Sequence, residues 1–169
     1  MFGSLVFLAA CILATNACSC RFGSQKQEDY QQYVCDEDIV IHAFIKNVIQ
    51  DNSSEPYNES IVQPFRRWLS FDIEIISIFR NATNSSVPAI VTTAGHSAAC
   101  GYAFKIGQEY LILGRLFKES NEEQNESKID QDASILTGLC SRNRKWNETP
   151  KEIAENLENG QYASNCGSA

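Results

Sequence analysis

The sequence contains few of the residues that carry catalytic chemistry. Only two histidines, His42 and His96, occur in 169 residues. There is no His-Glu-x-x-His, Gly-x-Ser-x-Gly or phosphate-binding glycine motif. His42 falls within an apolar strand pattern, and His96 lies in a loop beside Gly95 and Cys100 with no nucleophile at a recognisable spacing. The adjacent carboxylates at 36–38 are typical of a solvated loop. We therefore expect that the chain is not an enzyme.

Basic residues and long apolar runs are also scarce. The chain has 21 acidic residues against 14 basic ones, which gives a net charge of −7. Such an acidic balance is unfavourable for binding nucleic acid or an anionic membrane. After residue 17, no apolar stretch approaches the length of a membrane span. We expect neither a nucleic-acid partner nor a membrane-spanning segment.

Residues 1–17 have the pattern of a secretory signal peptide. An apolar run at 5–13 is followed by Thr15-Asn16-Ala17, which places small residues at the first and third positions of a cleavage site. No Lys or Arg precedes the run, and a buried N-terminal strand or helix is the alternative interpretation. We predict cleavage after Ala17, so that residues 18–169 form one secreted, extracellular domain with a single core.

The cysteines indicate a disulfide-bonded domain. Of seven cysteines, Cys11 lies in the predicted signal peptide and six remain in the mature chain. An even number in an exported protein favours disulfides. Zinc binding competes with this interpretation, but there is no Cys-x-x-Cys pair and the spacings are long and irregular. Three disulfides are predicted, and spacing alone leaves fifteen possible pairings.

Asn-x-Ser/Thr sequons support export, since such sites are glycosylated in secreted proteins. Five of the six sequons lie in segments that are also predicted to be loops. The candidate glycosylation sites are Asn52, Asn58, Asn81, Asn84, Asn125 and Asn147.

From Cys35 onward, hydrophobic patterning predicts strands separated by polar loops. The predicted strands are 39–49, 68–79, 89–93, 110–117 and a weaker one within 133–139. A short helical turn is expected at 30–33. Near the end, Thr149 as N-cap, Pro150 as the first helical residue and Glu152 as its capping-box partner predict a helix that stops at Gly160.

Five strands with few helices indicate a mainly β fold with helices. The pattern suits a small β-barrel, the OB-like five-stranded topology among others. A β-sandwich fits the same pattern, and periodicity does not separate the two.

The position of Cys18 is the strongest functional signal. Cleavage after Ala17 would make Cys18 the first residue, with a free α-amino group whose pKa lies near neutrality. The neutral amine and the carbonyl oxygen of the same residue can then chelate a metal in a five-membered ring. A catalytic zinc keeps one position open for water, and bridging Cys18 and Cys20 to the body would hold the terminus rigid. The alternative is that these cysteines only anchor the terminus.

These residues resemble the tissue inhibitors of metalloproteinases (TIMPs), in the single netrin-like-domain form found in invertebrates. The resemblance spans residues 18–169. The matching segments are Cys18-Ser19-Cys20, the Cys35-Asp-Glu-Asp-Ile-Val-Ile-His-Ala-Phe segment, Ala99-Cys100-Gly101-Tyr102, Tyr110-Leu111-Ile112-Leu113-Gly114, Cys140 followed by Trp146-Asn147, and Cys166.

The resemblance implies an OB-like barrel with disulfides Cys18–Cys100, Cys20–Cys140 and Cys35–Cys166. It also implies an inhibitory wedge, in which the backbone amine and carbonyl of Cys18 bind the protease's zinc and displace its water. Ser19 would enter the primary specificity pocket and Arg21 would continue along the cleft. Ala98 and Ala99, tied through Cys100, would form the second edge of the wedge.

The same resemblance implies a monomer with no cofactor of its own, whose partners are zinc metalloproteases of the matrix metalloproteinase type. One segment departs from the family pattern. The Pro and His-Pro expected after Cys20 are replaced by Arg21-Phe22-Gly23-Ser24, and the stretch before Cys35 is longer. This altered segment, residues 21–34, motivates a second hypothesis: a secreted netrin-like module that does not inhibit, such as an immunomodulator acting on a cell-surface receptor. No residue specifically supports a third hypothesis, in which the chain is a component of the extracellular matrix.

Overall fold

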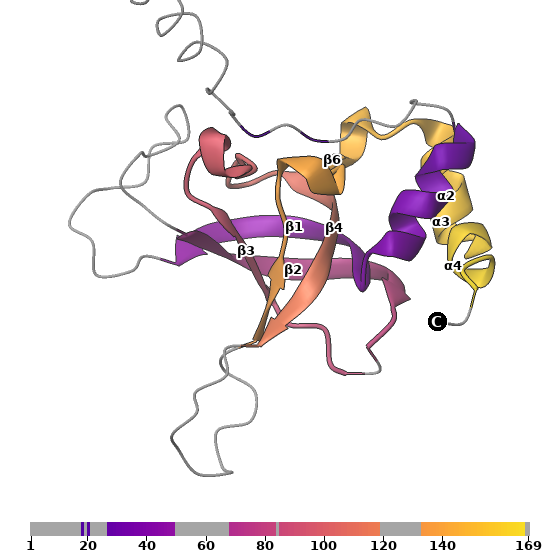
Figure 1. The fold of residues 1–169 in the computed structure, drawn as a ribbon, viewed down its shortest axis with the longest axis horizontal. Helices are drawn as coiled ribbons and strands as arrows, with labels where there is room; N and C mark the ends of the chain where they lie inside the picture. Colours follow the sequence, from indigo (N-terminus) through magenta and orange to yellow (C-terminus); the bar gives the residue numbers. More distant parts are fainter. Residues whose placement is uncertain are drawn as a thin grey trace, which may run out of the picture.

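Five strands close into a barrel, and short helices pack against its outside (Figure 1). The structure is a computed structural model that describes residues 18, 20, 27–49, 68–83, 85–118 and 133–167. The strands are β1 (Ile39–Ile49), β2 (Trp68–Asn81), β3 (Ile90–Ala94), β4 (Glu109–Lys118), β5 (Ala133–Leu136) and the short β6 (Arg144–Lys145). The helices are α2 (Gln27–Asp36), α3 (Lys151–Glu158) and α4 (Gln161–Ser164), with single 3-10 turns η1 (Ser97–Ala99), η2 (Leu139–Ser141) and η3 (Trp146–Glu148).

The strand order is β1-β2-β3-β5-β4, and a further pairing of β1 with β4 closes the barrel. Four of these five pairings are antiparallel, whereas β3 and β5 run parallel, with Val91 opposite Ile135. The two-residue β6 adds to β4, with Tyr110 opposite Lys145. The predicted mainly β, OB-like five-stranded barrel is therefore confirmed, and the alternative sandwich is wrong.

The barrel interior is filled by alternate residues of the strands. Ile39, Ile41, Ala43 and Ile45 of β1 all point into it and are at most 1% exposed. They pack with side chains from the other strands, among them Phe71, Ile73, Val91, Tyr110, Ile112 and Ile135. Burying one such large apolar side chain stabilises the fold by about 1.5–3 kcal/mol, so this cluster holds the barrel closed.

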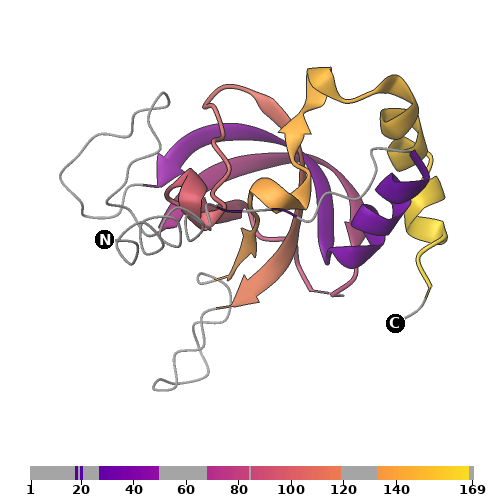
Figure 2. The ribbon, with the colours of Figure 1, turned by 45° about the horizontal axis from the view of Figure 1, so that its top comes forward.

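A second apolar cluster lies outside the barrel, under the helices. Val40 of β1 and Leu111 and Leu113 of β4 belong to this cluster, together with Ile153 and Leu157 of α3. Tyr30 and Val34 of α2 and Tyr162 of α4 complete this cluster. The three helices gather on one side of the barrel (Figures 1 and 2), and residues 39–43 of β1 and 110–114 of β4 are buried on both faces.

The strand predictions agree with the structure, and the helix predictions agree less well. The segment 39–49 is β1 as expected, and the other four strands differ from their predicted bounds by a few residues. The helical turn expected at 30–33 is the centre of the longer helix α2. None of the helices that the structure describes is both long enough and apolar enough to cross a membrane.

The predicted start of the C-terminal helix is wrong by one residue. Pro150 is the N-cap of α3, without a side-chain cap, and the helix begins at Lys151. Thr149 instead closes η3: its amide donates to the Trp146 carbonyl at 3.0 Å and its hydroxyl to the Lys145 carbonyl at 3.1 Å. Because η3 uses the Thr149 hydroxyl, this residue does not form the expected capping box. Gly160, at φ +73°, ends the helix as predicted.

The acidic segment at 36–38 is less solvated than its composition indicates. Oε2 of Glu37 lies 3.5 Å from Nε of Arg115, and Oδ2 of Asp38 accepts a hydrogen bond from the Leu116 amide at 3.2 Å. Burial raises the pKa of Glu37, and the Arg115 charge opposes that increase. These carboxylates therefore fasten the end of α2 to strand β4.

Candidate functional site

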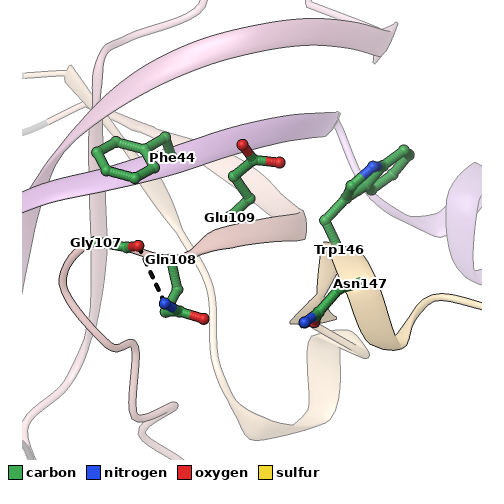
Figure 3. Close-up of a pocket in the computed structure, with 6 residues that line it drawn as sticks. All are labelled: Phe44, Gly107, Gln108, Glu109, Trp146 and Asn147. Atoms are coloured by element: carbon green, nitrogen blue, oxygen red, sulfur yellow. Dashed lines mark hydrogen bonds between the residues drawn. The ribbon is translucent and has the colours of Figure 1, made fainter.

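Each of the two histidines makes a local structural contact. His42 is 8% exposed, its Nε2 donates to Oε2 of Glu109 at 2.9 Å, and its ring stacks on Trp146 at 4.0 Å. Glu109 and Trp146 also line a small pocket beside β1 (Figure 3). Nδ1 of His96 accepts a hydrogen bond from the Ala99 amide at 3.1 Å. These contacts give both rings roles in maintaining the fold.

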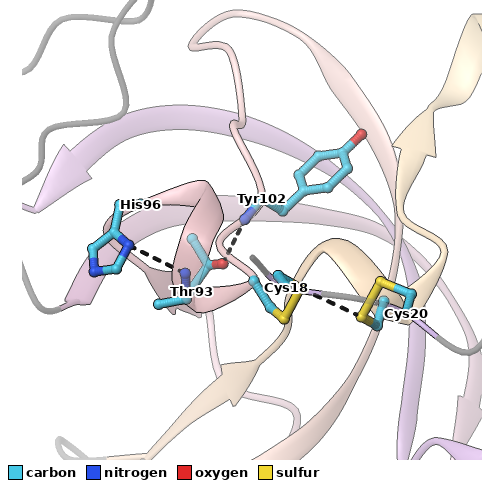
Figure 4. The surroundings of a disulfide bond; sticks show 8 residues. Cys18, Cys20, Thr93, His96 and Tyr102 are labelled. Atoms are coloured by element: carbon cyan, nitrogen blue, oxygen red, sulfur yellow. Dashed lines mark hydrogen bonds between the residues drawn. A yellow bond between two sulfur atoms is a disulfide. The ribbon is translucent and has the colours of Figure 1, made fainter. Parts of the chain in front are cut away.

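The predicted wedge residues that the structure describes meet at one end of the barrel. Cys18 and Cys20 are half-buried and form disulfides with Cys100 and Cys140 (Figure 4). The Cα–Cα distances across these bridges are 5.1 and 5.2 Å. The sulfurs of Cys18 and Cys140 lie 3.9 Å apart, so the two bridges pack side by side. The third disulfide, Cys35–Cys166, joins the end of α2 to the chain after α4.

The parallel pairing of β3 with β5 places Cys100 and Cys140 together. Parallel strands leave a sheet at the same edge, so η1 after β3 and η2 after β5 emerge at the same end of the barrel. The Leu139 amide donates to the Cys100 carbonyl at 2.7 Å, which joins the two turns directly. Gly138 permits this approach, because a Cβ there would lie 2.7 Å from the same Cys100 oxygen. The N-terminal segment is thus bridged to two turns that are bonded to each other.

The η1 turn presents Ala98 and Ala99 to solvent on a rigid backbone. His96 caps the turn, and the amides of Cys100 and Gly101 donate to the Ser97 and His96 carbonyls at 3.0 and 3.1 Å. Cys100 adopts the left-handed conformation, with φ +63°. A side chain at Gly101 would collide with the Ala94 carbonyl, so glycine is required there. Both alanines are exposed.

Buried polar groups brace the η2 turn against β4. The Thr137 hydroxyl donates to the Leu113 carbonyl at 2.6 Å, and the Leu113 amide donates to Oδ1 of Asn143 at 3.0 Å. The Asn143 amide donates in turn to Oγ1 of Thr137 at 2.8 Å and to the Gly138 carbonyl at 3.0 Å. Satisfied buried networks of this kind impose one geometry, since breaking them leaves polar groups without partners.

Aromatic residues flank both turns. The Tyr102 amide donates to Oγ1 of the buried Thr93 at 2.9 Å (Figure 4). Burial raises the pKa of Tyr102 to about 12, with Tyr110 and Glu148 adding to the increase and Arg144 opposing it. This hydroxyl therefore stays neutral at physiological pH. On the η2 side, Arg142 donates to the Tyr33 hydroxyl at 2.9 Å and lies over its ring, which ties the turn to α2.

The sulfurs in this region are not zinc ligands. Those of Cys18, Cys100 and Cys140 lie within 4.8 Å of one another. All three belong to disulfides, and zinc is bound by thiolates rather than by oxidised sulfur. The cluster is therefore a structural clamp.

The structure brings together five of the seven predicted wedge residues: Cys18, Cys20, Ala98, Ala99 and Cys100. Ser19 and Arg21 lie outside the described residues, as do the sequons at Asn52, Asn58, Asn84 and Asn125. His96, Gly101 and Gly138 also shape the turns, although no sequence motif predicts a role for them. The only signal in the sequence is that His96 and Gly101 lie close to Cys100.

Comparisons with known proteins agree with this architecture. Residues 16–169 match the family model for tissue inhibitor of metalloproteinase. Over 114 residues, the chain is 27% identical to a Caenorhabditis elegans protein named "Putative metalloproteinase inhibitor tag-225", and the match covers 67% of each chain. Members of the matched family are protease inhibitors rather than enzymes. The chain belongs to the tissue inhibitor of metalloproteinase family.

Proposed function

We propose that this chain is a secreted inhibitor of zinc metalloproteases that acts through its mature N-terminus. Cleavage after Ala17 exposes the amine of Cys18, and this amine and the Cys18 carbonyl chelate the catalytic zinc of the protease. The chelate occupies the position of the water that would attack the substrate, so hydrolysis stops. The zinc belongs to the partner, and the inhibitor supplies only backbone atoms.

The observation that carries this proposal is the double clamp on the N-terminal segment. Two disulfides hold Cys18 and Cys20 against turns that are themselves joined by the bond between Leu139 and Cys100. A terminus fixed in this way loses little conformational entropy when it binds, and that preorganisation increases affinity.

The neighbouring residues suit insertion into a narrow cleft. Ala98 and Ala99 are small, exposed and next to Cys100, so they offer a second edge without bulky side chains. Ser19 lies between the bridged cysteines and is the residue proposed to enter the primary specificity pocket. Arg21 would extend along the cleft. Because Ser19 is small, selectivity would come largely from these neighbours.

Export through an oxidising compartment is part of the same proposal. Disulfides form and persist in secreted proteins, and the three disulfides join segments far apart in the chain. The predicted leader and the sequons are consistent with a secreted, extracellular, glycosylated monomer. Proteases of the matrix metalloproteinase type are the proposed partners.

A second candidate function rests on the altered segment at 21–34. There, Arg21-Phe22-Gly23-Ser24 stands in place of the family's prolines. The absence of these prolines and the greater length of the segment favour a secreted module that binds a cell-surface receptor and does not inhibit proteases. This alternative predicts saturable cell binding that survives acetylation of the N-terminus.

One added residue tests the mechanism. The secreted chain, with its start at Cys18 verified by intact mass, should inhibit a matrix-type metalloprotease stoichiometrically. Adding one alanine before Cys18 should abolish inhibition, because an amide nitrogen is a far poorer zinc donor than an amine. An alanine added after Ala169 serves as the matched control. Equal potency of the N-terminally extended and native chains would refute the chelation mechanism.

A further inference from the structure

A small pocket opens on the barrel surface beside β1. It has a volume of about 240 Å³ and is lined by Phe44, Gly107, Gln108, Glu109, Trp146 and Asn147. Pockets for drug-sized ligands measure about 300–1,000 Å³, so this one suits a single small ring. The pocket has aromatic side chains on two sides and amide and carboxylate groups between them. This lining suits a sugar.

The walls of the pocket are held in place by the fold. Trp146 stacks on His42 at 4.0 Å, and His42 donates to Glu109 at 2.9 Å. The side chain of Glu109 is 48% exposed beyond this contact. Gln108 is exposed, and its amide donates to the Gly107 carbonyl at 3.1 Å. The site is therefore preformed, with polar groups that remain accessible to a ligand.

One lining residue is also a glycosylation sequon. Asn147 is exposed, and Asn147-Glu148-Thr149 fits Asn-x-Ser/Thr. Its turn is fixed by the Thr149 hydroxyl bond to Lys145 and by the 3.1 Å ion pair between Lys145 and Glu148. Figure 3 shows Phe44 and Trp146 on opposite sides of the pocket and the amide end of Asn147 turned toward Gln108. A substituent on this amide would start at the pocket itself.

The other sequon asparagine that the structure describes is placed differently. Nδ2 of Asn81 donates to the Ser85 carbonyl at 2.7 Å, and its Oδ1 accepts from the Thr83 amide and hydroxyl at 3.1 and 2.8 Å. These bonds fold the Asn81 side chain back onto its own loop. Of these two sequons, Asn147 is the one that lines the pocket.

We propose that Asn147 carries an N-linked glycan and that its first N-acetylglucosamine packs into this pocket. One face of the sugar ring lies against Phe44, and its hydroxyl and acetamido groups bond Gln108 and Glu109. In the attachment step, Nδ2 bonds to the anomeric carbon of an oligosaccharide carried on a lipid pyrophosphate. The bond from that carbon to the pyrophosphate oxygen breaks, its electron pair leaves with the pyrophosphate, and the amide loses one proton.

The first test is whether the modification exists. The full chain is expressed in secreting eukaryotic cells that make high-mannose glycans, and peptides are mapped by mass. Enzymatic release of the glycan should convert Asn147 to Asp, and an unmodified Asn147 would overturn the proposal. The proposal requires export but not protease inhibition, so its failure and that of the proposed function are separable.

The second test is whether the first sugar packs. An endoglycosidase trims every glycan to one N-acetylglucosamine in both the native sequence and the Asn147→Gln variant, which then differ by one sugar. The native chain should melt about 2–4 °C higher, the effect of one well-packed group in a domain of this size. The same two chains made in bacteria and refolded, and therefore unglycosylated, should melt together.

Gln108→Ala provides the matched control, since it alters the pocket and leaves the sequon intact. In this background, the difference in Tm between the trimmed native and Asn147→Gln chains should shrink, as expected for two groups in contact. Equal Tm values for the two trimmed chains, or a difference that Gln108→Ala leaves unchanged, would overturn the packing of the sugar in this pocket.

Discussion

Removing the Cys18–Cys100 disulfide should weaken inhibition far more than removing Cys35–Cys166, although both changes should destabilise the fold equally. With the other bridges intact, opening Cys18–Cys100 relaxes a ring of about 42 residues, two from position 18 to 20 and 40 from 100 to 140. Opening Cys35–Cys166 relaxes a ring of about 41 residues, through Cys20–Cys140. Chain entropy for rings of this size corresponds to about 4 kcal/mol in each case.

The two variants differ in what they release. The Cys18→Ser/Cys100→Ser variant keeps the backbone amine and carbonyl of residue 18. It releases residues 18 and 19 from the barrel, whereas Cys20 stays bridged. Ordering one residue costs about 1–2 kcal/mol. Because both released residues must become ordered on binding, the binding free energy should weaken by about 2–4 kcal/mol, or roughly 30- to 1,000-fold in Ki. Cys35→Ser/Cys166→Ser leaves both N-terminal bridges intact, and its Ki should stay near that of the native chain.

Urea unfolding measures the stability of both variants, and titration against a matrix-type metalloprotease measures Ki at a temperature where both are folded. Near-UV circular dichroism verifies that each retains its tertiary packing. If the two variants lost inhibition to the same extent, or if the Cys18 variant kept native potency, rigidity of the terminus would not be the source of affinity.

Two further predictions concern the turns around the clamp. Gly101→Ala should lower the free energy of unfolding by about 1–3 kcal/mol or more, because the new Cβ meets the Ala94 carbonyl. Gly167→Ala, in open space, should change little in the same denaturation assay. In alkaline titration, Tyr30 and Tyr102 should ionise near pH 12, since burial raises the pKa of both. Because the folded state holds these protons more tightly, their contribution to stability is complete below pH 10, the ordinary pKa of tyrosine, and is lost as pH rises toward about 12. Tyr102→Phe should reduce that loss, and phenolate absorbance of Tyr102 near pH 10 would contradict the assignment.

The strands could be predicted because the burial of their side chains is visible in the local pattern of apolar and polar residues. The first part of strand β1, residues 39–45, is almost fully buried on both faces, so a near-continuous apolar run marks it in the sequence. In β2, alternation at Phe71 and Ile73 similarly reveals the inward face. Propensity and pattern are sufficient for such elements because the sheet face and the sequence share a period of two.

Other features depend on partners distant in the chain. Nothing in residues 90–94 or 133–136 indicates that these strands pair in parallel, and cysteine spacing alone does not choose among the pairings of six cysteines. The three pairs that the structure contains are those implied by the family resemblance. The hydrogen bond between Leu139 and Cys100, the need for glycine at 101 and 138, and the turn that engages Thr149 all follow from tertiary contacts that sequence patterns do not encode.

The parallel pairing of β3 and β5 has a consequence for biosynthesis. Cys100 and Cys140 become neighbours only after those strands have found each other across more than 40 residues, and contacts of that range form late in folding. Correct oxidation of Cys18 and Cys20 therefore depends on a nearly completed barrel. Until then, the nascent chain exposes thiols that can pair wrongly. The yield of active molecules should therefore depend on how much disulfide isomerase the producing cell supplies.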